Sequence, residues 1–314
     1  MLRRTISSSE QRYTVKDKEE EGEEEEEEEG EILFAADPRR AGRLHSQSHL
    51  RKLPRAPPSP PATKRIPASA EDRVVQGSRA VQGQFPFQAG LMIDGSGFCG
   101  GSLISTTAVL TAAHCVDAGS FFTVLLGGLE PRPTSGDNSQ SFATTDAIKN
   151  DAFYTPDGNA AYYDVGVILW SDPITITDYV KPIKLPSRSQ VSETFAGSDA
   201  TVTGWGLTSN DAWTVAGYLQ YADVQIWDNA DCQAIYGELV DSNAICAMGT
   251  NGQHTCYGDS GGPLAVTGSD GEPLVVGVVS WGTANDCESG QPDVFMRVTA
   301  FLDWIGENAG VTIS

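Results

Sequence analysis

The sequence is first informative through what it lacks. No apolar run approaches the roughly 20 residues that a transmembrane helix needs, so no helical membrane span is predicted. Residues 1–30 contain no apolar segment of the kind that forms the centre of a secretory signal peptide. None of the 6 cysteines precedes Cys99 and no two are spaced as CxxC, which argues against a zinc site built from cysteine pairs.

Basic residues are scarce in the larger part of the chain. Residues 1–73 carry nearly equal numbers of acidic and basic side chains, so most of the formal net charge of −21 belongs to residues 74–314. So acidic a surface argues against nucleic acid or heparin as a partner. It suits basic or protein-rich substrates, although an acidic surface that serves only solubility explains the charge equally well.

Residues 1–73 have too little apolar content to bury a core. They contain a run of glutamates, Glu23–Glu29, and a basic, proline-rich stretch, Arg39–Pro67. This composition predicts a disordered, low-complexity segment. Docking of this segment on a partner is the alternative, but charge runs are usually just solvated.

Three short strings hold the residue types of a nucleophilic hydrolase. TAAHC contains His114, YYDVGVIL contains Asp164 and TCYGDSGGPL contains Ser260. A serine hydroxyl needs a base such as His114, and a buried carboxylate such as Asp164 would fix the imidazole tautomer and stabilise the imidazolium. A tight turn at the glycines would let the backbone N–H groups of Gly258 and Ser260 face an oxyanion.

Each string alone has an ordinary explanation, because a serine among glycines is usually a surface loop and a histidine beside a cysteine is usually packed or metal-bound. Together they occur in the order His, Asp, Ser, unlike the order in subtilisins or α/β-hydrolases. On these residues, the segment 74–314 resembles a complete chymotrypsin-like (trypsin-like, S1) serine protease domain. The resemblance implies a serine endopeptidase with an all-β fold of two antiparallel β-barrels and a C-terminal helix. The active site would lie between the barrels, with His114 and Asp164 from the first and Ser260 from the second.

Local patterns agree with an all-β domain. Short apolar runs predict strands at Phe121–Leu126, Ala200–Thr203 and Leu274–Ser280, and the residues Ser269–Gly271 predict a turn between two strands. Apolar residues at helical spacing predict one closing helix within Val298–Asn308.

The cysteines fit a secreted domain held by disulfides. Six cysteines allow 15 pairings, and the sequence alone does not choose among them. The resemblance implies the pairs Cys99–Cys115, Cys232–Cys246 and Cys256–Cys287. No cofactor or metal is expected, and no convincing calcium loop is present.

The string DRVVQG at 72–77 resembles the activation site of the family. Cleavage after Arg73 would free the α-amino group of Val74, which would then pair with Asp259 beside the nucleophile. Before cleavage a buried carboxylate would lack this counter-charge, so the oxyanion loop would be misassembled and the protein is expected to be a zymogen. The pair Val75-Gln76 departs from the commoner Ile-Val-Gly-Gly pattern, but Val74 and Gly77 keep its essentials.

The substrate pocket departs from the trypsin pattern. His254 occupies the floor position where trypsins have aspartate, and Asp293, in GQPDVF, occupies a second floor position that is usually glycine. The displaced aspartate and the ending RVTAFLDWI resemble the brachyurins, broadly specific digestive proteases of crustaceans and insects. If the His254 imidazole approaches Asp293, the pair would neutralise the floor and a chymotrypsin-like or broad preference follows; otherwise Asp293 alone would bind Arg or Lys. Substrate backbone would pair with Ser280, Trp281 and Gly282.

The resemblance also implies a setting. A protease with three disulfides belongs in the secretory pathway, so we expect a secreted protein whose natural amino terminus differs from Met1, in preference to unconventional export. The expected partners are protein or peptide substrates, a trypsin-like activator and protein inhibitors, with no membrane, and the chain is expected to be a monomer. A digestive role is favoured over a regulatory cascade because no cysteine-rich clip-like module precedes the domain. A non-catalytic homologue that binds partners is the alternative from another class, but such proteins usually lose a triad residue.

Overall fold

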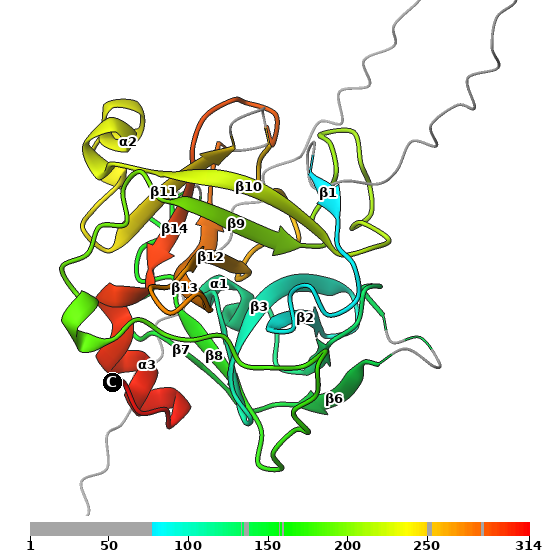
Figure 1. The fold of residues 1–314 in the computed structure, drawn as a ribbon. Coiled ribbons are helices and arrows are strands. Elements are labelled where there is room, and N and C mark those ends of the chain that lie inside the picture. Colours follow the sequence, from blue (N-terminus) through cyan, green and yellow to red (C-terminus); the bar gives the residue numbers. More distant parts are fainter. Residues whose placement is uncertain are drawn as a thin grey trace, which may run out of the picture. The chain divides into compact units, whose positions relative to one another are not determined.

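The computed structural model describes residues 77–314 except 133, 135–137, 157, 159, 250–252 and 284–285. The predictions made for residues 1–73, including Arg73, and for Val74 lie outside these residues. The described chain forms two seven-stranded antiparallel sheets; Figure 1 draws the first in cyan to green and the second in green to red, apart from its first strand, which is cyan. No helix within it is long and apolar enough to cross a membrane.

The first sheet has the strand order β6-β5-β2-β3-β4-β8-β7. Its strands are β2 (Gln88–Ile93), β3 (Gly97–Ser105), β4 (Ala108–Thr111), β5 (Phe122–Leu126), β6 (Gln140–Thr144), β7 (Ala147–Lys149) and β8 (Gly166–Leu169). The strand predicted at Phe121–Leu126 is confirmed as β5, which begins one residue later. Every residue of β4 is buried, so this strand crosses the core rather than its surface.

The second sheet has the order β1-β10-β11-β14-β13-β12-β9, and an additional pairing of β9 with β10 closes it into a barrel. Its strands are β1 (Ser78–Arg79), β9 (Asp199–Gly204), β10 (Gln220–Trp227), β11 (Ala244–Gly249), β12 (Pro263–Thr267), β13 (Pro273–Trp281) and β14 (Asp293–Arg297). Burial alternates along β10, as expected for a sheet with one solvated face. The predicted two-barrel fold is confirmed, with the difference that no pairing within the described residues closes the first sheet.

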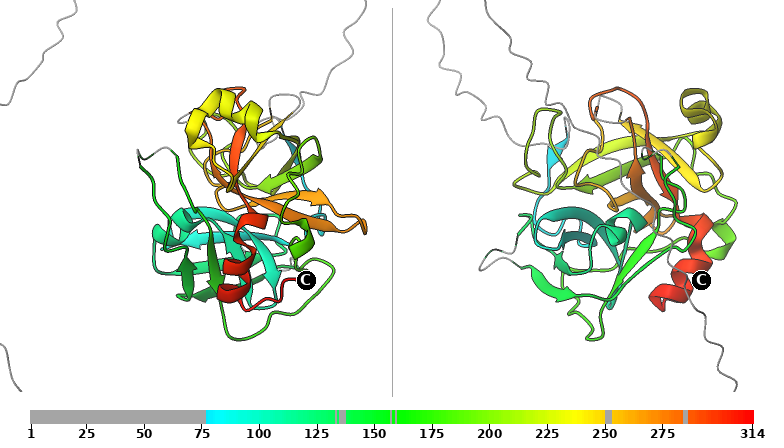
Figure 2. Two further views of the ribbon diagram at one scale, coloured as in Figure 1. Left: turned by 90° about the vertical axis from the view of Figure 1, so that its left-hand side faces the viewer. Right: turned by 180° about the vertical axis from the view of Figure 1, so that it is seen from behind.

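The helices are short, and α2, in yellow, and α3, in red, lie on the outside of the sheets (Figure 2). They are α1 (Ala113–Asp117), α2 (Asn229–Tyr236) and α3 (Leu302–Ala309), with 3-10 turns η1 (Arg188–Gln190), η2 (Gly237–Leu239) and η3 (Val298–Phe301). The predicted closing helix is therefore a 3-10 turn followed by α3. Three residues per turn place Val298 and Phe301 on one face, and both are buried. Phe301, Leu302 and Ile305 join the apolar core of the first sheet, which positions the carboxyl end of the chain.

The two sheets each have an apolar core and contact one another. The first core includes Leu91 and Leu110, and the second includes Ile245, Leu264 and Phe295. Contacts of β3 with β12 and of β4 with β13 join the two halves. The residues that carry the predicted chemistry lie along this junction.

Candidate active site

Strand pairing brings His114 and Asp164 together, although they are far apart in sequence. β4 and β8 are antiparallel partners, with Thr111 opposite Gly166, and α1 begins directly after β4. His114 therefore follows the end of one strand and Asp164 precedes the start of its partner. Asp164 Oδ1 accepts the His114 backbone N–H at 2.8 Å, and Asp164 Oδ2 lies 2.7 Å from the ring Nδ1.

The Asp164 carboxylate is fully buried and its oxygens are well supplied with donors. Besides His114, the Ser280 hydroxyl donates to Oδ2 at 2.5 Å. Burial raises the pKa of Asp164, but the charge and hydrogen bonds of His114 and the hydrogen bond of Ser280 outweigh it and leave the pKa below its usual value. Burial lowers the pKa of His114, but the charge of Asp164 and its hydrogen bond outweigh that and leave the pKa raised. The ring is thus a stronger base than a free imidazole.

Ser260 lies in a loop whose backbone conformation requires glycine at two positions. Gly258 and Gly261 have φ values of +100° and +80°, in the region that L side chains rarely adopt. A Cβ at Gly261 would also lie 2.2 Å from Thr111 Oγ1 and 2.6 Å from the Gly100 carbonyl oxygen. Gly100, in β3, donates its N–H to the Ser260 carbonyl at 2.7 Å and so ties the loop to the first sheet.

The loop contains two backbone donors beside the cleft. Within the described chain, the N–H groups of Gly258 and Ser260 donate to no other group, and both residues line the cleft. Two free N–H groups beside a hydroxyl can stabilise the oxyanion of an acyl-transfer intermediate. Among the described residues, no hydrogen bond joins the Ser260 hydroxyl to the His114 ring, as is common in ligand-free sites.

Asp259 is buried and immediately precedes Ser260 in the chain. Its carboxylate accepts the N–H groups of Gly206 at 2.7 Å and Cys256 at 3.0 Å, and no cation among the described residues pairs with it. Burial raises the pKa of Asp259 to about 6, even though these two donors lower it, and the charge of Asp293 adds to the increase. Ionised Asp259 is therefore an anion in need of a positive partner.

A cleft of about 570 Å³ opens beside these residues. Its size falls within the range of ligand pockets. His114, Ser260 and Ser280 line this cleft, and with the buried Asp164 they are called the catalytic wall below. Trp281 and the half-exposed Tyr257 also line the cleft. The cleft therefore joins the polar catalytic groups to a space with aromatic edges.

At the end of this cleft is the pocket floor, the name used here for His254, Thr255 and Asp293. Asp293 lines the cleft and its Oδ2 accepts the Thr255 N–H at 2.7 Å. Its Oδ1 lies 2.9 Å from where a Cβ on Gly282 would stand, so a side chain there would collide with the carboxylate. His254 does not line the cleft; its ring is 2% exposed and its Nδ1 lies 3.9 Å from Asp293 Oδ1. The imidazole thus approaches the carboxylate from behind.

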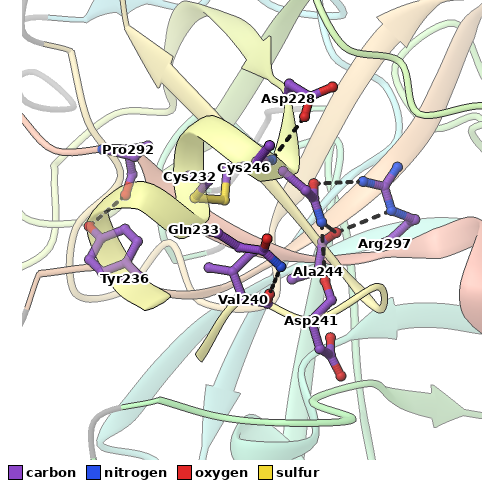
Figure 3. Close-up of a disulfide and its surroundings, with 12 residues drawn as sticks. Asp228, Cys232, Gln233, Tyr236, Val240, Asp241, Ala244, Cys246, Pro292 and Arg297 are labelled. Carbon is purple, nitrogen blue, oxygen red and sulfur yellow. Dashed lines mark hydrogen bonds between the residues drawn. A yellow bond between two sulfur atoms is a disulfide. The ribbon is translucent and has the colours of Figure 1, made fainter. Parts of the chain in front are cut away.

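Helix α2 is bonded to β11 and to the residue before Asp293, as Figure 3 shows. The disulfide Cys232–Cys246 joins α2 to β11, and the Tyr236 hydroxyl donates to the Pro292 carbonyl at 2.8 Å. Because Pro292 immediately precedes Asp293, this hydrogen bond holds the start of β14 in place. The Tyr236 ring also meets Trp281 edge-on, with centroids 5.2 Å apart.

The three predicted disulfides are confirmed, and they exclude one metal site. Cys99, His114 and Cys115 lie close enough to hold an ion, but the two sulfur atoms are bonded to each other and offer no thiolate. The disulfides are Cys99–Cys115, Cys232–Cys246 and Cys256–Cys287.

Sequence reasoning missed three contacts that shape the site. Ser280 is predicted to pair with substrate backbone, and its hydroxyl in addition donates to Asp164. Tyr236 was not singled out at all. Asn210 was also missed: its Nδ2 donates to Asp286 Oδ1 and its Oδ1 accepts the Cys287 N–H, both at 2.8 Å. No local string marks these residues, because each acts across a long sequence separation.

Comparisons with known proteins agree with this geometry. The family model described as Trypsin matches residues 74–305. Brachyurin of Leptuca pugilator is 41% identical over 242 residues, which cover 76% of this chain and 100% of that protein. Collagenase of Hypoderma lineatum is 36% identical over 247 residues, 77% of this chain and 89% of that protein. A solved structure titled HL collagenase is 36% identical, covers 76% of this chain and 100% of its own, and superposes with a TM-score of 0.67.

Proposed function

The chain belongs to the trypsin family and is a serine endopeptidase, and from that premise we propose that it is a secreted digestive enzyme made as a zymogen. The observation that carries the proposed chemistry is the catalytic wall beside two free N–H groups. A base held by a buried carboxylate, a serine in the same cleft and two unpaired donors together supply what acyl transfer needs.

The proposed reaction assigns one role to each residue. His114 takes the proton from Ser260 as its Oγ attacks the scissile carbonyl, and the N–H groups of Gly258 and Ser260 stabilise the oxyanion. His114 then gives the proton to the leaving amine, and an acyl-enzyme remains. Water activated by the same imidazole releases the acyl group. Asp164 keeps the ring oriented and stabilises its charged form, which its buried position and short contacts support.

Activation is proposed to depend on Asp259. The new α-amino group of Val74, released by a trypsin-like activator, would neutralise this carboxylate and fix the loop that carries the oxyanion donors. The support is the burial of Asp259 together with its pKa, raised to about 6 by that burial. An unpaired carboxylate is costly in such a site above that pH.

The proposed substrate preference is chymotrypsin-like or broad at the residue before the scissile bond, called P1. The approach of His254 to Asp293 supports a floor whose negative charge is reduced. Gly282, which has no side chain, leaves space at the side of the P1 pocket, and Trp281 supplies an apolar surface there. Arg or Lys specificity through Asp293 alone is the second candidate, supported by the fact that Asp293 lines the cleft and His254 does not.

The test uses a fluorophosphonate or aryl phosphonate that labels a reactive serine. Protein cleaved after Arg73 is expected to incorporate one label at Ser260, whereas the uncut protein and the Arg73→Gln variant treated with trypsin are expected to remain unlabelled. Ser260→Ala is the matched control for the labelled site. Equal labelling of the Arg73→Gln variant would contradict the zymogen, and no labelling of correctly cleaved protein would contradict the catalytic assignment.

A further inference from the structure

Residues 74–314 contain two histidines, and the proposed mechanism uses one of them. The other, His254, is buried at the pocket floor, and its Nε2 has no hydrogen-bond partner within the described chain. Gln253, the residue before it, also has a buried side-chain oxygen without a partner among the described residues. A buried imidazole that does no catalytic chemistry, next to the carboxylate at the end of the pocket, calls for a role.

The two carboxylate oxygens of Asp293 face different surroundings. Oδ2 accepts the Thr255 N–H at 2.7 Å, which fixes the orientation of the group. Oδ1 lies beside Gly282 on the cleft side and 3.9 Å from His254 Nδ1 on the buried side. The carboxylate thus stands between the substrate space and the imidazole, and a charge on either side acts on the same group.

We propose that protonation of His254 switches the P1 preference of the pocket between uncharged and basic side chains. With the imidazole charged, the floor is an ion pair with no net charge, which admits apolar and aromatic groups. With the imidazole neutral, Asp293 carries an uncompensated negative charge that attracts Arg or Lys. Because a basic P1 side chain and an imidazolium compete for the same carboxylate, binding of the basic side chain releases the proton from His254.

Two further titratable side chains, Asp259 and Tyr236, have pKa values that the charge of Asp293 affects. Asp259 is close enough for its pKa to be raised by the charge of Asp293, although burial is the larger cause of its value of about 6. Helix α2 carries Tyr236. Burial raises the pKa of Tyr236, its hydrogen bond with Thr283 lowers it, and the charge of Asp293 raises it further. Asp259 is therefore the group whose titration must be separated from that of His254.

The rim of the pocket carries one more acidic side chain. Asp286 lines the cleft, and Asn210 donates to one of its oxygens at 2.8 Å. Residues 250–252 and 284–285, which lie outside the described structure, include no titratable side chain. Asp286 is present in the wild-type protein and in every variant below, so it does not account for a difference between them.

The inference rests on the proposed function, and the experiment separates the two. Protein cleaved after Arg73 is assayed with two peptides that differ only at P1, one with arginine and one with citrulline, its uncharged isostere. The ratio of their kcat/KM values cancels the titration of His114, because both substrates need the same base. The ratio is expected to rise roughly tenfold from the acid to the alkaline end of the range in which the enzyme is active, because the imidazole loses its charge as pH rises.

Two variants identify the groups. His254→Gln is expected to flatten the pH dependence of the ratio at a high value, whereas any slope due to Asp259 would persist. Asp293→Asn is expected to lower the ratio at every pH, and most at high pH. Each protein is first titrated for active serine, so that a variant that fails to fold is recognised; His254→Asn then replaces His254→Gln.

The outcomes are distinguishable. A wild-type ratio that is independent of pH, or that falls as pH rises, overturns the switch even if both peptides are cleaved. An unchanged slope in the active His254→Gln or His254→Asn enzyme overturns the assignment to His254. Failure to cleave either peptide, together with no titratable serine, overturns the proposed function itself.

Discussion

The catalytic wall and the pocket floor differ in how their polar atoms are paired. On the wall, the Asp164 carboxylate has no exposure and is supplied by the His114 ring, a backbone N–H and the Ser280 hydroxyl. On the floor, Asp293 accepts one hydrogen bond at 2.7 Å, and its contact with His254 is 3.9 Å long. The buried Nε2 of His254 has no partner in the described chain.

The roles proposed for the two regions account for the difference. A catalytic group must hold one protonation state and one orientation, so redundant donors around it reduce the chance of a misplaced proton. A pocket that receives a variable side chain gains from groups whose charge can change. The comparison therefore predicts that changes on the wall lower the rate for every substrate, whereas changes on the floor redistribute rate among substrates.

Asp164→Asn should have the largest effect, because it removes the charge that stabilises the His114 imidazolium and the acceptor that orients its ring. The amide would act as a donor toward His114 and favour the wrong tautomer, so kcat should fall roughly 10⁴-fold, the loss that this change causes in a related triad. Burial would still lower the pKa of His114 while the charge that raises it is gone. The acid limb of the kcat/KM profile should therefore move to lower pH.

Ser280→Ala is the matched control for that change. It removes one hydrogen bond to the carboxylate and leaves its charge, so the loss of kcat should be far smaller and the acid limb should stay near its original position. Comparable losses in Asp164→Asn and Ser280→Ala would mean that the hydroxyl, rather than the charge, holds the ring.

Asp259→Asn should have the next largest effect. Asp259 is adjacent to Ser260 of the wall in the chain, and its pKa responds to the charge of Asp293 in the floor. In the folded chain, burial raises the pKa of Asp259 from 3.8 to about 6, so its stabilising contribution is fully present below pH 3.8 and is lost as pH rises through about 6. Asparagine does not ionise. In the uncut protein, the variant should therefore gain free energy of unfolding relative to wild type as pH rises from about 4 to about 8, by a few kcal/mol.

Urea denaturation of the uncut proteins at several pH values measures this difference. In the protein cleaved after Arg73 the sign should reverse, because the neutral amide of the Asp259→Asn variant would no longer pair with the Val74 amine, and both stability and activity should drop. The exposed Asp172→Asn is the control, with no pH-dependent difference expected. A difference at Asp259 that does not vary with pH would contradict the raised pKa as its cause.

The sequence predicted the wall better than the floor, for physical reasons. His114, Asp164 and Ser260 lie in strings whose neighbours also build the turns that place them, so local sequence carries most of the information. Gly258 is predicted from the tight turn that the run of glycines implies, and its φ of +100° is one that glycine adopts freely.

The floor depends on contacts across the fold that no string encodes. His254 and Asp293 were found as positions, but the side of the carboxylate from which the imidazole approaches follows only from the packing of β14 against the loop before Ser260. Closure of the second sheet, and its absence within the described part of the first, likewise depends on which strand edges meet rather than on any single apolar run.

Asn210→Ala should have the smallest effect and sharpens the comparison at the rim of the pocket. Asn210 bridges Asp286 and the Cys287 N–H, and so links the loop after Trp205 to the segment that precedes Asp293. Because these hydrogen bonds are exposed, their loss should raise KM by a few fold, in keeping with about 1 kcal/mol, while kcat stays unchanged. Steady-state kinetics with leucine and phenylalanine at P1 measure the two constants separately, with Ser209→Ala as the neighbouring control. A drop in kcat without a change in KM would place this link in the machinery of the wall, and the division between a fixed wall and an adjustable floor would then fail at its border.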